Sequence, residues 1–192
     1  MRLSLRAFTA GALFALALSA CDDSTKTAAA PVPIEPTAAS IAHFCNMAVL
    51  EHPGPKGQIF LKSKIEPIWF ASVRDTVAFT LLPEEPKDIA AIYVNDMAKI
   101  EDWQHPKAGS WVDARSAWYV LGSDFDAAMG GREAVPFGAE ADARRFAGTH
   151  GGTVARFGDV PQEYVLGPDT ETAEPHAHPQ QAAAPAAREH AP

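Results

Sequence analysis

The sequence predicts an α+β fold in which two successive ββαβ-type units form one compact domain, with irregular segments before and after it. Short β-type runs and one helical stretch follow each other in the same order twice, and proline and glycine separate them. Both ends of the chain are instead rich in alanine and proline. Identity between the two halves is low, so the internal repeat is a hypothesis that rests on the order of elements.

The first unit is predicted between residues 45 and 94. A Pro53-Gly54-Pro55 turn blocks both helix and ladder pairing, so the β-type runs on either side of it form a hairpin candidate. Apolar residues then recur at helical spacing until Pro83 stops the helix. The predicted elements are strands at 45–50, 58–61 and 89–94 and a helix at 71–82.

The second unit repeats this order more loosely. Its helix is followed by Gly148, Gly151 and Gly152, residues that commonly end helices. The predicted elements are strands at 110–112, 117–121 and 153–157 and a helix at 139–147.

The N-terminus has the features of an exported bacterial lipoprotein. A short basic region precedes an apolar run that is shorter than the roughly 20 residues a membrane-spanning helix requires. The run ends in Leu-Ser-Ala-Cys at 18–21, which resembles the sequence at which a cysteine receives a diacylglyceryl group. Ordinary cleavage after Ala20 is the alternative. We expect a lipid on Cys21 and a location on the periplasmic face of a membrane, with Asp22 favouring the inner membrane.

The composition divides the chain into four segments. We predict a signal peptide at 1–20, a lipidated flexible stalk at 21–40, a folded domain at 41–167 and a disordered tail at 168–192, because alanine- and proline-rich segments bury too little apolar surface to fold. The net charge of the whole chain is −8, and loss of the two arginines of the signal peptide leaves 14 basic against 24 acidic residues, or −10. Nucleic acid is therefore excluded as a partner class, since phosphate binding requires a basic face.

Cys45 is the residue that most needs an explanation. With Cys21 lipidated, it has no partner for an intrachain disulfide, and an unprotected reactive thiolate would oxidise outside the cytoplasm. Met47 lies two positions on, and residues two apart on a strand share a face. A thiolate and a thioether that converge on one ion favour Cu(I) over zinc. The alternative interpretation is a buried cysteine and methionine that only pack in the core.

Met97 is a plausible third sulfur, because it ends a strand at a polar Asn95-Asp96 step where a core methionine is unexpected; a core role is the alternative. His150, between Thr149 and Gly151, is typical of a helix end. The histidines followed by proline, at 52 and 105, are interpreted as turn residues. Motifs for enzymes are absent: the chain has no phosphate-binding glycine loop, no GxSxG elbow and no CxxC pair.

Several separated motifs resemble the NosL family of accessory lipoproteins of nitrous oxide reductase. They are CNM at 45–47, HPGPKGQ at 52–58, YVNDMA at 93–98, GSWVDARSAWYVLGS at 109–123, AMGG at 128–131 and THGG at 149–152. The resemblance covers essentially the whole predicted domain. It implies two ββαβ-type units, similar to part of organomercurial lyase.

The same resemblance implies a function and a set of ligands. The function is that of a periplasmic Cu(I) chaperone, which is not an enzyme and delivers copper for nitrous oxide reductase together with the NosDFY-type ABC transporter complex. Cys45 and Met47 match the family's CxM ligands, and Met97 matches a third. Met129 and His150 also lie in family motifs and are further candidates.

Two departures and two alternatives accompany this expectation. The chain has no second cysteine near Cys45 and only a sparse histidine tail, so a two-thiolate site and loading through the tail are both in question. The first alternative is an enzyme that uses Cys45 as a nucleophile with Asp96 as its acid or base. The second is a structural lipoprotein in which Cys45 is buried.

Overall fold

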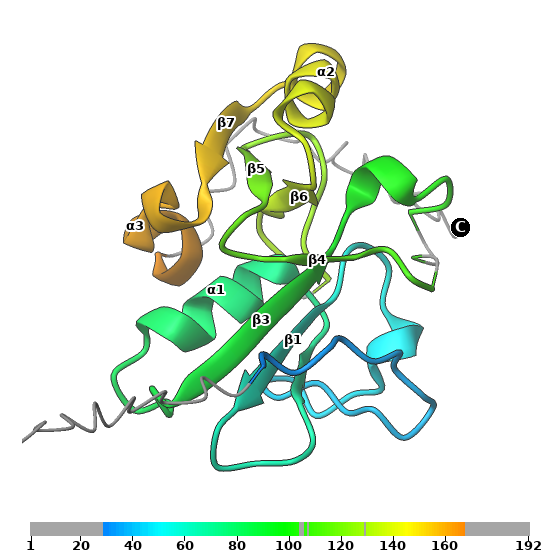
Figure 1. Cartoon of the computed structure of the whole chain (residues 1–192). Helices are drawn as coiled ribbons and strands as arrows, with labels where there is room; N and C mark the ends of the chain where they lie inside the picture. The colour runs from blue at the N-terminus through cyan, green and yellow to red at the C-terminus, as the bar shows by residue number, and fades with distance from the viewer. Residues whose placement is uncertain (1–28, 104–105, 107, 129, 168–192) are drawn as a thin grey trace, which may run out of the picture.

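The computed structural model describes residues 29–103, 106, 108–128 and 130–167. It contains two antiparallel sheets, one of four strands in the order β2-β1-β3-β4 and one of three in the order β6-β5-β7. Figure 1 shows the second sheet and its helix α2 above the first sheet and its helix α1. Within the described residues, no helix is long and apolar enough to cross a membrane.

The first sheet and its helix are formed by residues 57–113. The strands are β1 (Gly57–Leu61), β2 (Ile68–Phe70), β3 (Ile89–Asn95) and β4 (Trp111–Asp113), and the helix is α1 (Val73–Leu81). Strand β1 lies between β2 and β3, and β4 extends the sheet beyond β3. A 3₁₀ turn, η2 (Met97–Lys99), follows β3.

The second sheet repeats this arrangement. It consists of β5 (Trp118–Leu121), β6 (Val135–Phe137) and β7 (Thr153–Arg156), with α2 (Glu140–His150) between β6 and β7. A 3₁₀ turn, η3 (Phe157–Asp159), and a short helix, α3 (Gln162–Leu166), follow. The order β6-β5-β7 has the same pattern as β2-β1-β3. The prediction of two ββαβ units is therefore confirmed.

The strands of each unit differ from those predicted. In both halves, the strand directly before the helix was not predicted, and β4, predicted to open the second unit, pairs instead with β3 of the first sheet. Strands β2 and β6 have three residues each, and β6 contains Pro136, so neither carries a readable β pattern. The two predicted helices and the strands β1, β3, β5 and β7 are present within a few residues of the predicted bounds.

The N-terminus of α1 is capped by side chains from both halves of the chain. The hydroxyl of Ser72 accepts from the Asp75 amide at 3.0 Å. The Glu133 carboxylate accepts from the amides of Val73 and Arg74 at 3.3 and 2.9 Å. These bonds satisfy donors that a helix cannot pair internally, and they fasten α1 to the segment before β6.

The main core unites the two units. It lies between the first sheet, α1 and residues of the second half that include Tyr119 of β5 and Val165 of α3. Tyr119 is fully buried, and its hydroxyl donates to the Ala114 carbonyl at 2.6 Å. A second cluster packs α2 on the second sheet, and a third lies beneath residues 42–49.

Part of the predicted stalk is attached to the first sheet. The side-chain amide of Gln58, fully buried in β1, donates to the Ile34 carbonyl at 3.0 Å and accepts from the Ile34 amide at 3.1 Å. The Tyr93 hydroxyl donates to the Pro31 carbonyl at 2.7 Å. Residues 31–35 are thus held by the domain, whereas a flexible stalk was predicted over 21–40. The side chains that hold this segment lie 24 or more residues away in sequence, so composition did not reveal them.

Candidate metal site

Cys45 and Met47 lie on a tight turn. The turn closes between Ala42 and Met47, where the Ala42 amide donates to the Met47 carbonyl at 2.9 Å. Inside it, the Asn46 amide donates to the Ala42 carbonyl, and Asn46 has φ +58°, a left-handed conformation that asparagine tolerates better than most residues. A short 3₁₀ turn, η1 (Val49–Glu51), follows.

The prediction of a strand at 45–50 is therefore wrong, and so is the argument that residues two apart on a strand share a face. A residue with positive φ between Cys45 and Met47 is incompatible with an extended strand, so the chain reverses here. The two sulfur-bearing residues instead lie two positions apart within one turn.

The thiol and the thioether differ in their exposure. Cys45 is half-buried and packs against a buried cluster of Ala42, Val49, Trp69 and Ala71. Met47 is 40% exposed. An apolar cluster therefore shields one side of the turn, while Met47 leaves the other side open to solvent.

A histidine that the sequence analysis interpreted as a turn residue lies next to the thiol. The Nε2 atom of His52 is 4.0 Å from the Cys45 sulfur. The loop that carries His52 is held in place by Lys56, whose ammonium group donates to the carbonyls of Pro53 and Gly54 at 2.9 and 2.5 Å. Burial lowers the pKa of Lys56 to about 8, against the opposing charge of Glu133.

An acidic side chain interacts electrostatically with this histidine. Burial raises the pKa of Asp75, at the start of α1, while the Ser72 hydroxyl and the charges of Arg74 and His52 act in the opposite direction. The Asp75 carboxylate therefore lies near enough to His52 for their charges to interact. Six residues separate Cys45 from His52 in the sequence. Their contact could not have been predicted without knowing how the loop between them folds.

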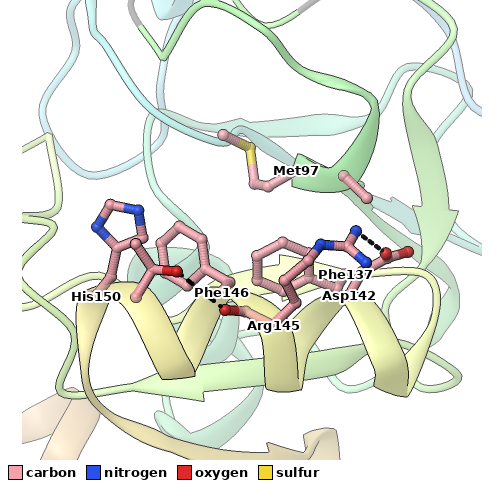
Figure 2. Close-up of a pocket in the computed structure, with 8 residues that line it drawn as sticks. Met97, Phe137, Asp142, Arg145, Phe146 and His150 are labelled. Atoms are coloured by element: carbon pink, nitrogen blue, oxygen red, sulfur yellow. Dashed lines mark hydrogen bonds and ion pairs between the residues drawn. The ribbon is translucent and has the colours of Figure 1, made fainter.

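Met97 and His150 belong to a different part of the molecule. Met97 begins η2, is 9% exposed and packs in the cluster that joins α2 to the second sheet. Together with His150, at the end of α2, it lines a hollow that Figure 2 shows in close-up. No described contact joins either side chain to Cys45.

Met129 lies outside the described residues, as do Cys21 and the histidine tail. The residue before Met129 in the chain, Ala128, packs against the same cluster as Cys45. Among the described residues, no group of three or more histidine, cysteine, aspartate and glutamate side chains is assembled for a metal ion.

Asp96, considered above as a possible acid or base, is held by hydrogen bonds and an ion pair within the fold. It is 5% exposed, and its Oδ1 atom accepts from the amides of Ala98 and Gly138 at 3.2 and 2.9 Å. Its Oδ2 atom forms an ion pair with Lys99 at 3.4 Å. These partners cap η2 and tie it to the residue after β6.

The fold and the turn define a class of two-unit ββαβ proteins that carry a free cysteine and a methionine on one surface turn. Within this class the chain belongs to the NosL family, whose model matches residues 33–165. It is 42% identical over 178 residues to the copper-binding lipoprotein NosL of Achromobacter cycloclastes, covering 92% of this chain and 91% of that protein.

Two further relatives agree with this assignment. The copper-binding lipoprotein NosL of Stutzerimonas stutzeri is 35% identical over 150 residues, covering 78% of this chain and 77% of the relative. The crystal structure of the copper chaperone NosL from Shewanella denitrificans is 33% identical and superimposes with a TM-score of 0.64, covering 68% of this chain and 96% of that chain.

Proposed function

We propose that this protein is a periplasmic, lipid-anchored Cu(I) chaperone that binds its cargo at the Cys45 turn. The observation that carries the proposal is the position of the Cys45 sulfur, 4.0 Å from His52 Nε2 and two residues before the exposed Met47. A thiolate, a thioether and an imidazole are soft or borderline donors that suit Cu(I). The names of the NosL relatives, which describe copper binding, support the same cargo.

The ligand set that the structure favours differs from the one implied by resemblance alone. Cys45 and Met47 remain the primary ligands, and His52 is added as a nitrogen donor because of its distance from the thiol. For the further sulfur ligand we favour Met129 over Met97, because its chain neighbour Ala128 packs against the same buried cluster as Cys45, whereas Met97 packs with the second sheet.

Family membership and the accessibility of the turn support a role in copper delivery. We infer that the recipient is nitrous oxide reductase, reached with the help of a NosDFY-type transporter complex. A ligand that is 40% exposed lets an incoming donor displace the protein's own ligands one at a time. A lipid on Cys21 would keep the domain at the membrane, at its periplasmic face.

Anaerobic titration with Cu(I), in competition with a chromophoric chelator, tests this proposal. Wild-type protein should hold one tightly bound Cu(I) per chain, and Cys45→Ser should lose it. Retention of both stoichiometry and affinity in Cys45→Ser would refute the assignment of the site.

The same assay separates the two methionines. Met129→Leu should weaken the tight site, whereas Met97→Leu, a change that conserves volume in the core, should leave it unchanged. The reverse result would restore Met97 to the Cys45 site and exclude Met129.

A further inference from the structure

The hollow between η2 and α2 contains a thioether and an imidazole that the Cys45 site does not use. It is lined by Met97 and Ala98 on one side and by Phe137, Phe146 and His150 on the other, with a volume of about 330 Å³. Figure 2 shows the Met97 side chain extending from η2 over the aromatic floor that His150 borders. Asp142, Arg145 and Thr149 complete the lining, so the hollow combines a thioether and an imidazole with walls that are partly apolar and partly polar.

The His150 ring is held in a defined orientation. Its Nδ1 atom is 3.1 Å from the Asp124 carboxylate, and the ring stacks on Phe146 at 4.4 Å between centroids and meets the edge of Phe125 at 4.9 Å. A carboxylate bound to one ring nitrogen fixes the tautomer in which the other nitrogen, Nε2, has its lone pair available. Histidines that ligate metals in proteins are usually oriented in this way.

The charged groups of the hollow neutralise one another. The guanidinium group of Arg145 is paired with the Asp142 carboxylate on the same helix, so neither presents an unbalanced charge to a monovalent cation. A hard divalent ion would need oxygen ligands and a negative site, whereas a soft monovalent ion is served by neutral sulfur and nitrogen donors.

We propose that Met97 and His150 form a second soft-metal site, which takes a monovalent d¹⁰ cation such as Cu(I) or Ag(I). It is separate from the Cys45 turn and shares no residue with it. Because both donors are neutral, the site binds a monovalent cation more weakly than a site containing a thiolate. A weak, open site of this kind suits transient occupancy during loading or release.

Ag(I), a redox-inert analogue of Cu(I), is the probe for the test. It is titrated into the full, isotopically labelled Cys45→Ser chain while imidazole nitrogens and methionine methyl groups are followed by NMR. The His150 Nε2 and Met97 methyl resonances should shift together and saturate. Residue-specific signals keep this binding distinct from any at the tail histidines, His176, His178 and His190.

Three variants in the same background identify the ligands. Met97→Leu should weaken Ag(I) binding at His150 by at least about tenfold, and Asp124→Asn by about tenfold, the loss typical when a group that orients a metal-binding histidine is removed. Met47→Leu is the matched control and should leave the His150 shift unchanged.

The proposal is overturned if the His150 resonances stay unmoved while those of the tail histidines titrate, or if Met97→Leu leaves the His150 shift as it was. Wild-type protein already loaded with one equivalent of Cu(I) provides a second test, in which only further equivalents should move His150. Failure of the Cys45 site itself would be seen in the chelator competition and leaves the result at His150 unaffected.

Discussion

The turn that carries Cys45 is shielded by apolar side chains on one side and open to solvent on the other. Cys45 packs on a buried cluster that includes Trp69, and Met47, two residues on, is 40% exposed. A thiolate and a monovalent cation together carry no net charge, which suits the proposed Cu(I) site, bordered on one side by an apolar cluster.

His52 provides the first prediction at this scale. His52→Gln should lower the affinity for Cu(I) by about tenfold or more, since even the loss of an outer partner of a metal ligand typically costs that much. The measurement is chelator competition under anaerobic conditions. His43→Gln is the matched control, because His43 lies on the same turn but its Nε2 atom is paired with Glu85 at 2.9 Å. Equal losses in both variants would contradict a ligand role for His52.

Glu133 is a buried acid whose ionisation is coupled to folding. Burial raises its pKa to about 7 from the ordinary 4.5, although the amides of Arg74, Ala134 and Val73 act in the opposite direction. Between these two pH values the folded protein keeps a proton on Glu133 that the unfolded chain releases. Raising the pH through this window therefore favours the unfolded state.

The free energy of unfolding should fall by about 3 kcal/mol between pH 4.5 and pH 7 through this group, and change little through it above that range. Urea denaturation at a series of pH values measures it. Glu133→Gln, which keeps an acceptor oxygen but cannot ionise, should lack this decline. An identical pH profile in the variant would show that Glu133 does not titrate in that window.

At the scale of secondary structure, α1 lies very close to β1 because Gly57 has no side chain. A Cβ atom at position 57 would lie 1.9 Å from the Thr76 hydroxyl oxygen, and Thr76 itself is fully buried and donates to the Ser72 carbonyl. The helix therefore cannot keep its present distance from the strand if a methyl group is added.

Gly57→Ala should destabilise the domain by about 1–3 kcal/mol, as overpacking of a well-packed core typically does. Thermal or urea unfolding gives the value. Gly148→Ala, in α2, is the control, since a Cβ there meets nothing within 4 Å and alanine favours helix. Restoration of stability in Gly57→Ala by Thr76→Ala would locate the clash.

The elements that sequence predicts here are those with a local physical cause. Helix α1 has a serine cap and a proline stop, α2 has a glycine-rich end, and β3 is long and β-branched. Strands β2 and β6 were missed because each is defined by its pairing with a neighbouring strand, β1 or β5, and three residues leave little pattern of their own; of the three-residue strands, only β4 was predicted. The CxM turn was taken for a strand because its reversal depends on one residue, Asn46, in a left-handed conformation.

The sequence analysis named candidate ligands for the site, but it did not predict how they are arranged. Residue types and spacing singled out Cys45 and Met47 as soft ligands. His52 lies next to Cys45 only because the loop between them closes. The environment of Met97 depends on the packing of η2 against β6 and α2. These are long-range contacts, which single-sequence patterns do not encode.

At the scale of the whole molecule, stability depends on the contacts between the two units. Asp96, after β3 of the first unit, accepts a hydrogen bond from the amide of Gly138 in the second, and Glu133 of the second unit caps α1 of the first. A buried carboxylate with three partners leaves unpaired donors when it is removed. The two units should therefore unfold together.

Asp96→Ala should cost about 1–3 kcal/mol, the penalty for leaving buried donors unsatisfied, in a single cooperative transition seen by both fluorescence and circular dichroism. Asp126→Ala is the control: its carboxylate pairs with Arg132 at the surface, where exposed ion pairs contribute about 0–1 kcal/mol. Two separate transitions in Asp96→Ala would instead show that the units fold independently.

The attachment of residues 31–35 to the first sheet limits the length of chain between the proposed lipid anchor and the folded domain. If the chain is anchored through Cys21, ten residue steps separate the lipid from Pro31, whose carbonyl is held by Tyr93. Fully extended, that segment spans at most about 35 Å. The Cys45 turn begins only a few residues beyond the attached segment. With the proposed lipid anchor in place, that turn would stay close to the bilayer, and any protein that accepts copper from it would have to approach the membrane.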